Sequence, residues 1–141
     1  MKENKINSFS SKIVLFASIL GFSGVILGAL GAHALKEGLE ARKMDSAWDT
    51  AVKYHLVHAV ALLALAAWVE ARLKGLGTEP KPPAKLYAWV VNCWVVGVTL
   101  FSGSLYLLAL DGPHWLGPVT PLGGVALLTG WALLAVVAWR D

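Results

Sequence analysis

The sequence has little of what most soluble enzymes and secreted domains depend on. Only 15% of its 141 residues are charged, whereas a soluble domain has about 25%. A single cysteine, Cys93, excludes an intrachain disulfide framework and a cysteine-based metal motif within one chain. We find no glycine loop in a strand-to-helix turn, no helical zinc motif and no serine–histidine–aspartate pattern. The sequence therefore favours a protein that is not an enzyme.

Apolar residues are what the sequence has in excess. They make up 57% of the chain and gather into four long runs. A helix rises about 1.5 Å per residue, so about 20 residues cross a hydrocarbon layer of about 30 Å. The predicted spans are residues 13–34, 48–73, 85–110 and 121–139. We predict that residues 1–141 form a single domain, an all-α integral membrane four-helix bundle with short loops.

The connections between the spans differ in character. Residues 36–49 are rich in charge, and apolar residues four apart, such as Leu35 and Leu39, predict a short interfacial helix between the first two spans. Glycine and proline in residues 75–83 predict a linker after the second span. The first apolar run is longer than the core of a signal peptide, so we expect it to stay as an uncleaved helix.

Basic residues predict the orientation in the membrane. Eight lie on the side of the N-terminus, the linker and the C-terminus: Lys2, Lys5, Lys12, Arg72, Lys74, Lys81, Lys85 and Arg140. Four lie on the other side: Lys36, Arg42, Lys43 and Lys53. The excess predicts a multi-pass protein of the cell (inner) membrane with both termini in the cytoplasm. The net charge of +3 then serves topology and contact with membrane lipid, and we expect no nucleic-acid partner.

The second span carries a cluster of polar side chains. His55 and His58 are three residues apart and share a helix face with Tyr54. Three interpretations stay open: buried histidines bonded to neighbouring helices, contact with a small molecule or lipid headgroup, and a metal or haem site. The last would use His33, His55 and His58, because His33 ends the first span on the same side of the membrane.

The third span carries a polar stripe made of Asn92, Thr99, Ser102 and Tyr106. In lipid such a stripe is expected to face protein or water. It predicts hydrogen bonds that hold the bundle together or, alternatively, the lining of a small polar cavity in a channel or transporter. Nothing in the spans resembles a proton or ion relay, which usually needs an acidic residue or a lysine within the membrane, and this disfavours a pump or an ion-coupled transporter.

Glycine forms one face of the first span. Gly21, Gly24, Gly28 and Gly31 follow one another at steps of three and four residues. Such a face lets another helix approach closely. It predicts packing against a helix of the same chain or, alternatively, a contact in a homo-oligomer or with a partner membrane protein.

Four segments carry a resemblance to a known family. They are GALGAHAL at residues 28–35, WDTAVKYHLVHA at 48–59, LFSGSLY at 100–106, and TPLGG at 120–124 followed by Gly130 and Trp131. In order and position the chain resembles the YgdD-like family of small four-span membrane proteins, known as domain of unknown function 423, with mitochondrial relatives called transmembrane protein 256. The resemblance covers nearly the whole chain after residue 12.

The resemblance implies a four-helix membrane protein but no established activity, substrate or cofactor. The residues that carry over as ligand-binding candidates are His33, Tyr54, His58, Ser102, Ser104, Tyr106 and Thr120, with Pro121 beside them. We predict that they converge near the non-cytoplasmic end of the bundle. The expected function is that of a non-enzymatic bundle that binds a lipid, a small molecule or a partner membrane protein.

Overall fold

The computed structural model describes residues 2–73 and 84–139. Within them the chain forms helices and turns and no strand, so the predicted all-α class is confirmed. The elements are α1 (Lys2–Ala32), α2 (Lys36–Ala41), α3 (Asp45–Leu73), α4 (Ala84–Ala109), a 3₁₀ turn η1 (His114–Leu116) and α5 (Val119–Trp139). The short helix expected between the first two spans is α2. The predicted linker at residues 75–83 lies outside the described residues.

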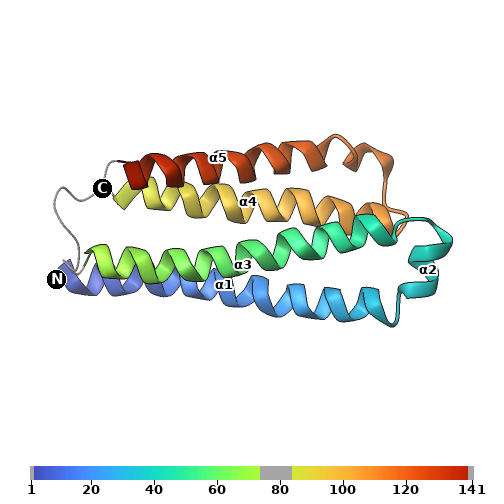
Figure 1. The fold of residues 1–141 in the computed structure, drawn as a ribbon, viewed down its shortest axis with the longest axis horizontal. Coiled ribbons are helices and arrows are strands. Elements are labelled where there is room, and N and C mark those ends of the chain that lie inside the picture. The colour runs from blue at the N-terminus through green and yellow to red at the C-terminus, as the bar shows by residue number, and fades with distance from the viewer. Residues whose placement is uncertain (1, 74–83, 140–141) are drawn as a thin grey trace.

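Two pairs of helices make the bundle. Helix α1 packs along α3, α4 packs along α5, and contacts between α3 and α4 join the pairs (Figure 1). Helix α1 begins and α5 ends at one end of the bundle, and α2 lies at the opposite end (Figure 1). The helix α1 starts at Lys2, well before the predicted span, because the apolar run marks only the part of the helix that enters the membrane.

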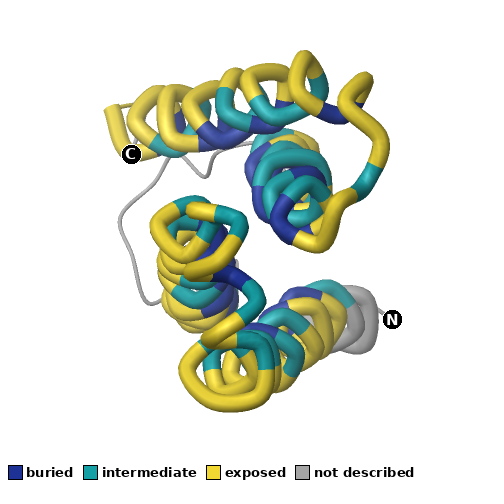
Figure 2. The backbone as a smooth tube through the Cα atoms, turned by 90° about the vertical axis from the view of Figure 1, so that its right-hand side faces the viewer, coloured by how far each residue is buried: buried dark blue, intermediate teal, exposed yellow. Residues whose placement is uncertain are grey.

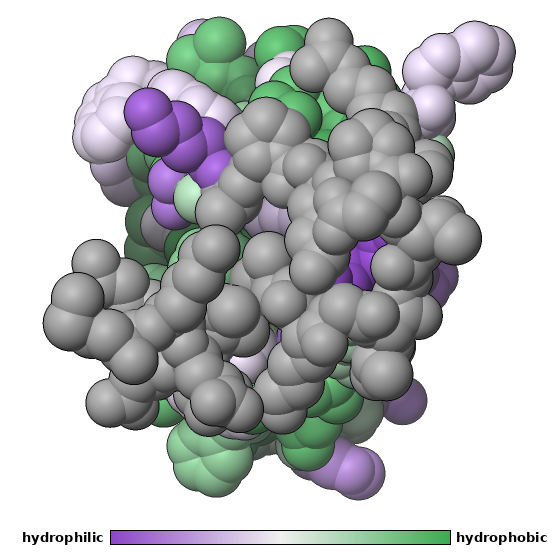
Figure 3. All heavy atoms as spheres, turned by 90° about the vertical axis from the view of Figure 1, so that its left-hand side faces the viewer, coloured by the Kyte–Doolittle hydropathy of each residue, from purple (hydrophilic) through white to green (hydrophobic). Residues whose placement is uncertain are grey.

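The outer surface of the helices is suited to lipid. Four segments are long and apolar enough to cross a membrane: Phe9–Ala32, Asp45–Arg72, Lys85–Ala109 and His114–Trp139. Buried positions face the middle of the molecule and exposed positions face outward (Figure 2). The outward positions include large apolar residues such as Phe22, 73% exposed, and Leu128, 71% exposed. Viewed onto the end where α1 begins, apolar side chains emerge at the upper and lower edges (Figure 3). Such a surface is stable in hydrocarbon and prone to aggregation in water.

Glycine sets how closely the helices approach. A side chain at Gly31 would overlap the indole of Trp48, and that indole donates its Nε1 proton to the Leu27 carbonyl at 3.0 Å. Gly24 and Gly28 likewise meet side chains of α3. The side of α1 that carries these three glycines is therefore covered by α3 of the same chain. This was the first of the two alternatives predicted for them.

Arg42 fastens α2 to the end of α4. Its Nε donates a hydrogen bond to the carbonyl of Ala109 at 3.0 Å, and its Nη1 lies 3.7 Å from Oδ2 of Asp111. Asp111 has a φ of 59°, and the amide of Gly112 bonds the Leu107 carbonyl at 2.8 Å. This is a Schellman ending with aspartate in the left-handed position. The guanidinium therefore satisfies a carbonyl that the end of α4 leaves free.

Candidate functional site

His58 is a buried residue of α3 that faces α5, and both of its ring nitrogens have protein partners. Its Nδ1 is 2.8 Å from the Tyr54 carbonyl, and the Trp131 indole donates to its Nε2 at 3.1 Å. A carbonyl only accepts and an indole N–H only donates, so His58 is the neutral tautomer with its proton on Nδ1. Binding a metal through Nε2 would require Trp131 to withdraw.

His55 connects three helices. Its Nδ1 is 3.3 Å from the hydroxyl of Tyr106 on α4, and its Nε2 is 3.3 Å from Oγ of Ser23 on α1. Ser23 gives its own proton to the Ile19 carbonyl at 2.8 Å, so its oxygen accepts from His55 Nε2. His55 Nδ1 then accepts from Tyr106. The result is a directional chain of hydrogen bonds across α4, α3 and α1.

Three more candidates join helices through their hydroxyl groups. Ser102, on α4, donates to the carbonyl of Ala51 on α3 at 2.9 Å. Ser104 and Thr120 pair at 2.7 Å and join α4 to α5. Ser104 also donates to the Phe101 carbonyl at 3.0 Å, so Thr120 is the donor in the pair. These contacts are interhelical hydrogen bonds of the kind that the polar stripe predicts.

His33 stays apart from the other histidines. It is exposed in the turn that follows α1, whereas His55 meets α1 at Ser23, ten residues and about 15 Å earlier along the helix. Among the described residues no three histidine, cysteine, aspartate or glutamate groups could hold a metal ion. The predicted metal or haem cluster of His33, His55 and His58 is therefore not formed, because His33 lies nearly three helix turns beyond the point at which His55 contacts α1.

The polar stripe of α4 is only half buried. Ser102 and Tyr106 face the bundle, whereas Asn92 and Thr99 are exposed. Thr99 bonds back to the Val95 carbonyl at 2.8 Å. The prediction that all four face protein or line one cavity is wrong for Asn92 and Thr99, because α4 packs against the other helices through neighbouring positions such as Val91, Trp94 and Val98.

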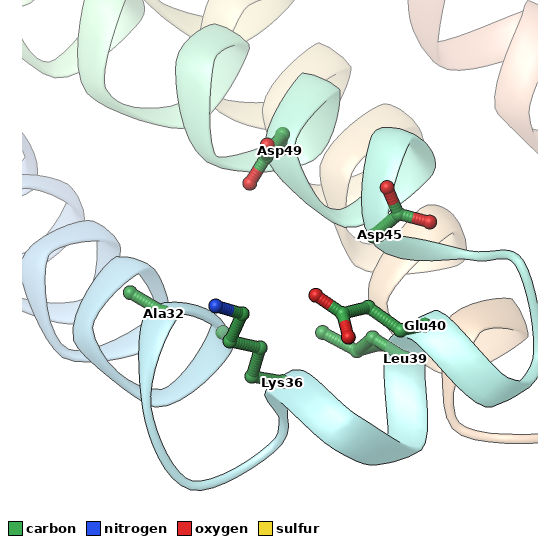
Figure 4. Close-up of a pocket in the computed structure, with 7 residues that line it drawn as sticks. Ala32, Lys36, Leu39, Glu40, Asp45 and Asp49 are labelled. Carbon is green, nitrogen blue, oxygen red and sulfur yellow. The ribbon is translucent and has the colours of Figure 1, made fainter.

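A hollow of about 320 Å³ opens at the α2 end of the bundle (Figure 4). Its walls come from the end of α1, from α2 and from the start of α3, and its lining is Gly31, Ala32, Lys36, Leu39, Glu40, Asp45 and Asp49. Lys36 and Glu40 of α2 extend into the space across from Asp49 of α3 (Figure 4). The four charged side chains are exposed, and no side-chain ion pair within 4.0 Å joins them. One ammonium and three carboxylates are thus available to a ligand.

Known proteins similar to this chain are membrane proteins without an assigned activity. Residues 27–124 match the family described as "Protein of unknown function (DUF423)". The "UPF0382 inner membrane protein YgdD" of Escherichia coli strain K12 is 39% identical over 91% of this chain and 89% of its own length. The "UPF0382 membrane protein YwdK" of Bacillus subtilis is 37% identical over 89% of this chain and 94% of its own length.

The chain belongs to the DUF423 family. The resemblance noted in the sequence is thereby confirmed, and with four spanning helices this DUF423 protein is a multi-pass membrane protein. No solved structure matches it.

Sequence reasoning missed two partners in this DUF423 bundle. Ser23 lies among the glycines of α1, where the spacing drew attention to backbone approach rather than to a hydroxyl. Trp131 lies in a motif of the resemblance, but its bond to His58 spans 73 residues of sequence. In both cases the sequence shows a polar atom on an otherwise apolar helix face. It does not show which residue of another helix that atom bonds.

Proposed function

We propose that this protein is a non-enzymatic membrane protein that binds the headgroup of a zwitterionic phospholipid in the hollow between α1, α2 and α3. The observation that carries the proposal is the presence of one ammonium and three carboxylates around an open hollow with an apolar floor at Leu39. The phosphate of such a lipid would pair with Lys36, and its amine would pair with the carboxylates of Glu40 and Asp49.

The interior of the bundle supports binding rather than catalysis. His55, His58, Ser102 and Ser104 each have a partner on another helix. A general base or nucleophile needs a face open to substrate, and these groups instead direct their polar atoms at protein. We therefore assign them to holding the helices, and we assign recognition to the surface.

The depth of the hollow supports a headgroup as its ligand. It lies at the end of α1 and the beginning of α3, where two spanning segments leave the membrane. Charged groups are inexpensive there because water and headgroups solvate them. His33, directly after Ala32, is the one candidate of the resemblance that lies beside this hollow in the sequence and is exposed.

The proposal extends to location and orientation. A relative that carries the name inner membrane protein and the excess of Lys and Arg on one side support the inner membrane with both termini in the cytoplasm. In that orientation the hollow opens toward the outer leaflet of the membrane.

Lipid retention in native mass spectrometry tests the proposal. Protein in mild detergent is mixed with phosphatidylethanolamine, phosphatidylcholine or phosphatidylglycerol. We expect phosphatidylethanolamine to be retained best, because its primary amine donates hydrogen bonds to carboxylates, and phosphatidylglycerol worst, because it has no cation.

Two glutamates on the same short helix provide a matched pair of variants. Glu40→Gln removes a carboxylate of the hollow, and Glu37→Gln removes an exposed one in the first turn of α2 that does not line it. Retention is expected to fall several-fold for Glu40→Gln and Asp49→Asn and to stay unchanged for Glu37→Gln. Equal retention by all variants, or no preference among the three lipids, would refute the proposal.

A further inference from the structure

The short helix α2 carries two of the charged side chains that line the hollow at its end of the bundle. Lys36 and Glu40 are four residues apart, so they lie on one side of α2, and both extend into the space across from Asp49 (Figure 4). A helix of six residues is too short to be stable alone. The position of these charges therefore depends on the contacts that α2 makes with the rest of the protein.

Leu39 provides the apolar contact of α2. It is 2% exposed and belongs to a buried cluster with Trp48 of α3 and with Tyr106 and Ala109 of α4. Burial of Leu39 favours contact between α2 and the bundle, but the hydrophobic effect has no direction. It does not by itself fix how α2 is turned, and hence how far Glu40 stands from Asp49.

Arg42 provides a directional contact. Its Nε donates to the Ala109 carbonyl at 3.0 Å, and its Nη1 lies 3.7 Å from Oδ2 of Asp111. A guanidinium holds several donors in one rigid plane, so it can meet two acceptors at once, which a lysine ammonium does less well. The side chain also lies against its own helix, since a Cβ added at Gly38 would be 3.3 Å from Nη2. Arg42 thus ties α2 to the end of α4.

The backbone carries this contact from Arg42 to the hollow. The amide of Met44 bonds the Leu39 carbonyl at 2.9 Å, and the amide of Lys43 bonds the Glu40 carbonyl at 3.0 Å. With Lys43 at a φ of 57°, these bonds form a Schellman ending. They close a turn that contains both Glu40 and Arg42, so a displacement of Arg42 also displaces Glu40.

We propose that Arg42 is a positioning residue for the hollow and that its bond to the Ala109 carbonyl holds Lys36 and Glu40 across from Asp49. This inference rests on the proposed binding of a phospholipid headgroup. Arg42 does not line the hollow, so it acts through α2 and makes no contact with the lipid. A zwitterionic headgroup needs an ammonium and a carboxylate at a set separation, and holding α2 in place before binding improves affinity and selectivity.

Native mass spectrometry of two neighbouring variants tests the proposal. Arg42→Gln removes the contact with α4, and Lys43→Gln removes an equal charge from an exposed position that does not line the hollow. We expect Arg42→Gln to retain several-fold less phosphatidylethanolamine and to lose its preference for this lipid over phosphatidylcholine. Lys43→Gln is expected to keep both. Equal retention and equal preference in the two variants would overturn the proposal.

Hydrogen–deuterium exchange without added lipid separates positioning from loss of folding. In Arg42→Gln we expect faster exchange at the amides of Lys43 and Met44, while the spanning parts of α3 and α4 keep their protection. In Glu40→Gln, which removes a carboxylate and leaves the contact with α4, exchange in α2 is expected to match the wild type. Faster exchange throughout the bundle of Arg42→Gln would mean that lipid is lost through unfolding, and it would overturn the proposal.

Asp111→Asn distinguishes the two partners of Arg42. Asparagine tolerates the left-handed conformation that Asp111 adopts, and the substitution removes only the ion pair. Asp111 is 77% exposed, and exposed ion pairs contribute little, so this variant is expected to keep most of its lipid retention. A loss as large as that of Arg42→Gln would overturn the role given to the Ala109 carbonyl.

Glu40→Gln separates failure of this inference from failure of the proposed function. Lipid lost from Glu40→Gln but kept by Arg42→Gln would overturn the role of Arg42 alone. Equal retention by the wild type and both variants would refute headgroup binding in the hollow, and the role of Arg42 with it.

Discussion

At the scale of single residues, the buried polar groups of this protein are arranged as donor and acceptor pairs. His58 accepts from Trp131 and donates to the Tyr54 carbonyl, and His55 accepts from Tyr106 and donates to Ser23. Each donor or acceptor role follows from a partner that can only donate or only accept in that contact. In hydrocarbon no water substitutes for a lost partner, so each pair fixes the register of two helices.

Trp131→Phe tests the pair at His58. The substitution keeps an aromatic ring and removes the indole donor, which leaves Nε2 of a buried imidazole without a partner. We expect the free energy of unfolding to fall by about 0.6–2 kcal/mol, the range for interhelical hydrogen bonds. Reversible unfolding in mixed micelles of mild detergent and dodecyl sulfate measures it.

Trp139→Phe is the control for that experiment. Trp139 is 91% exposed near the end of α5, so its loss leaves no buried group unpaired. An equal loss of stability in the two variants would contradict the role given to the Trp131–His58 bond.

At the scale of helices, close approach at glycine determines which helices pair. A side chain at Gly123 of α5 would overlap the backbone of Phe101 on α4, whereas one at the neighbouring Gly124 would lie 3.8 Å from the Phe101 ring, an ordinary contact. The two adjacent glycines therefore play different roles, although the sequence presents them as equivalent.

Gly123→Ala and Gly124→Ala make a matched test of this difference. Overpacking at Gly123 is expected to cost about 1–3 kcal/mol of stability. Alanine at Gly124 is expected to be neutral or to stabilise by up to about 1 kcal/mol, because alanine favours helix more than glycine does. The same unfolding assay compares them. A Gly124→Ala protein that is the less stable of the two would show that α4 and α5 pack in another register.

At the level of helices, the sequence predicted the elements but not all of the contacts between them. Apolar runs predicted the four spans, because hydrocarbon thickness sets the length of a run that crosses it. The spacing of Leu35 and Leu39 in a charged segment predicted α2. The stripe of α4 was predicted to face protein along its whole length, yet Asn92 faces outward. Spacing shows which residues share a helix face but not which edge of that face the neighbouring helices cover.

For the candidate site as well, the sequence predicted individual residues but not how they come together. Through the resemblance, the sequence named His58, Ser102, Ser104, Tyr106 and Thr120 as ligand-binding candidates, and the structure connects each one to another helix or to the backbone. It did not identify the hollow at α2, because Glu40 and Asp49 are ordinary surface charges in sequence and gain a shared space only when α2 folds across the bundle end.

At the scale of the whole molecule, the fold is a pair of helix pairs in a membrane. The beginning of α1 and the end of α5 lie at the same end (Figure 1), as four crossings require. The larger number of basic residues at this end favours the cytoplasm for it.

A reporter fused after Asp141 tests that orientation. With the C-terminus in the cytoplasm, a green fluorescent protein fusion is expected to fluoresce, and an alkaline phosphatase fusion is expected to be inactive. The opposite pattern would reverse the assignment and turn the hollow toward the cytoplasm.

The central claim is that interior polar residues hold the bundle while the hollow at α2 binds lipid. Retention of phosphatidylethanolamine, measured by native mass spectrometry in Glu40→Gln and Ser102→Ala together with their stabilities, separates the two roles most directly. The account predicts that Glu40→Gln loses lipid and keeps its stability, and that Ser102→Ala, which loses its bond to Ala51, becomes less stable and keeps lipid. Lipid lost from Ser102→Ala and kept by Glu40→Gln would contradict it.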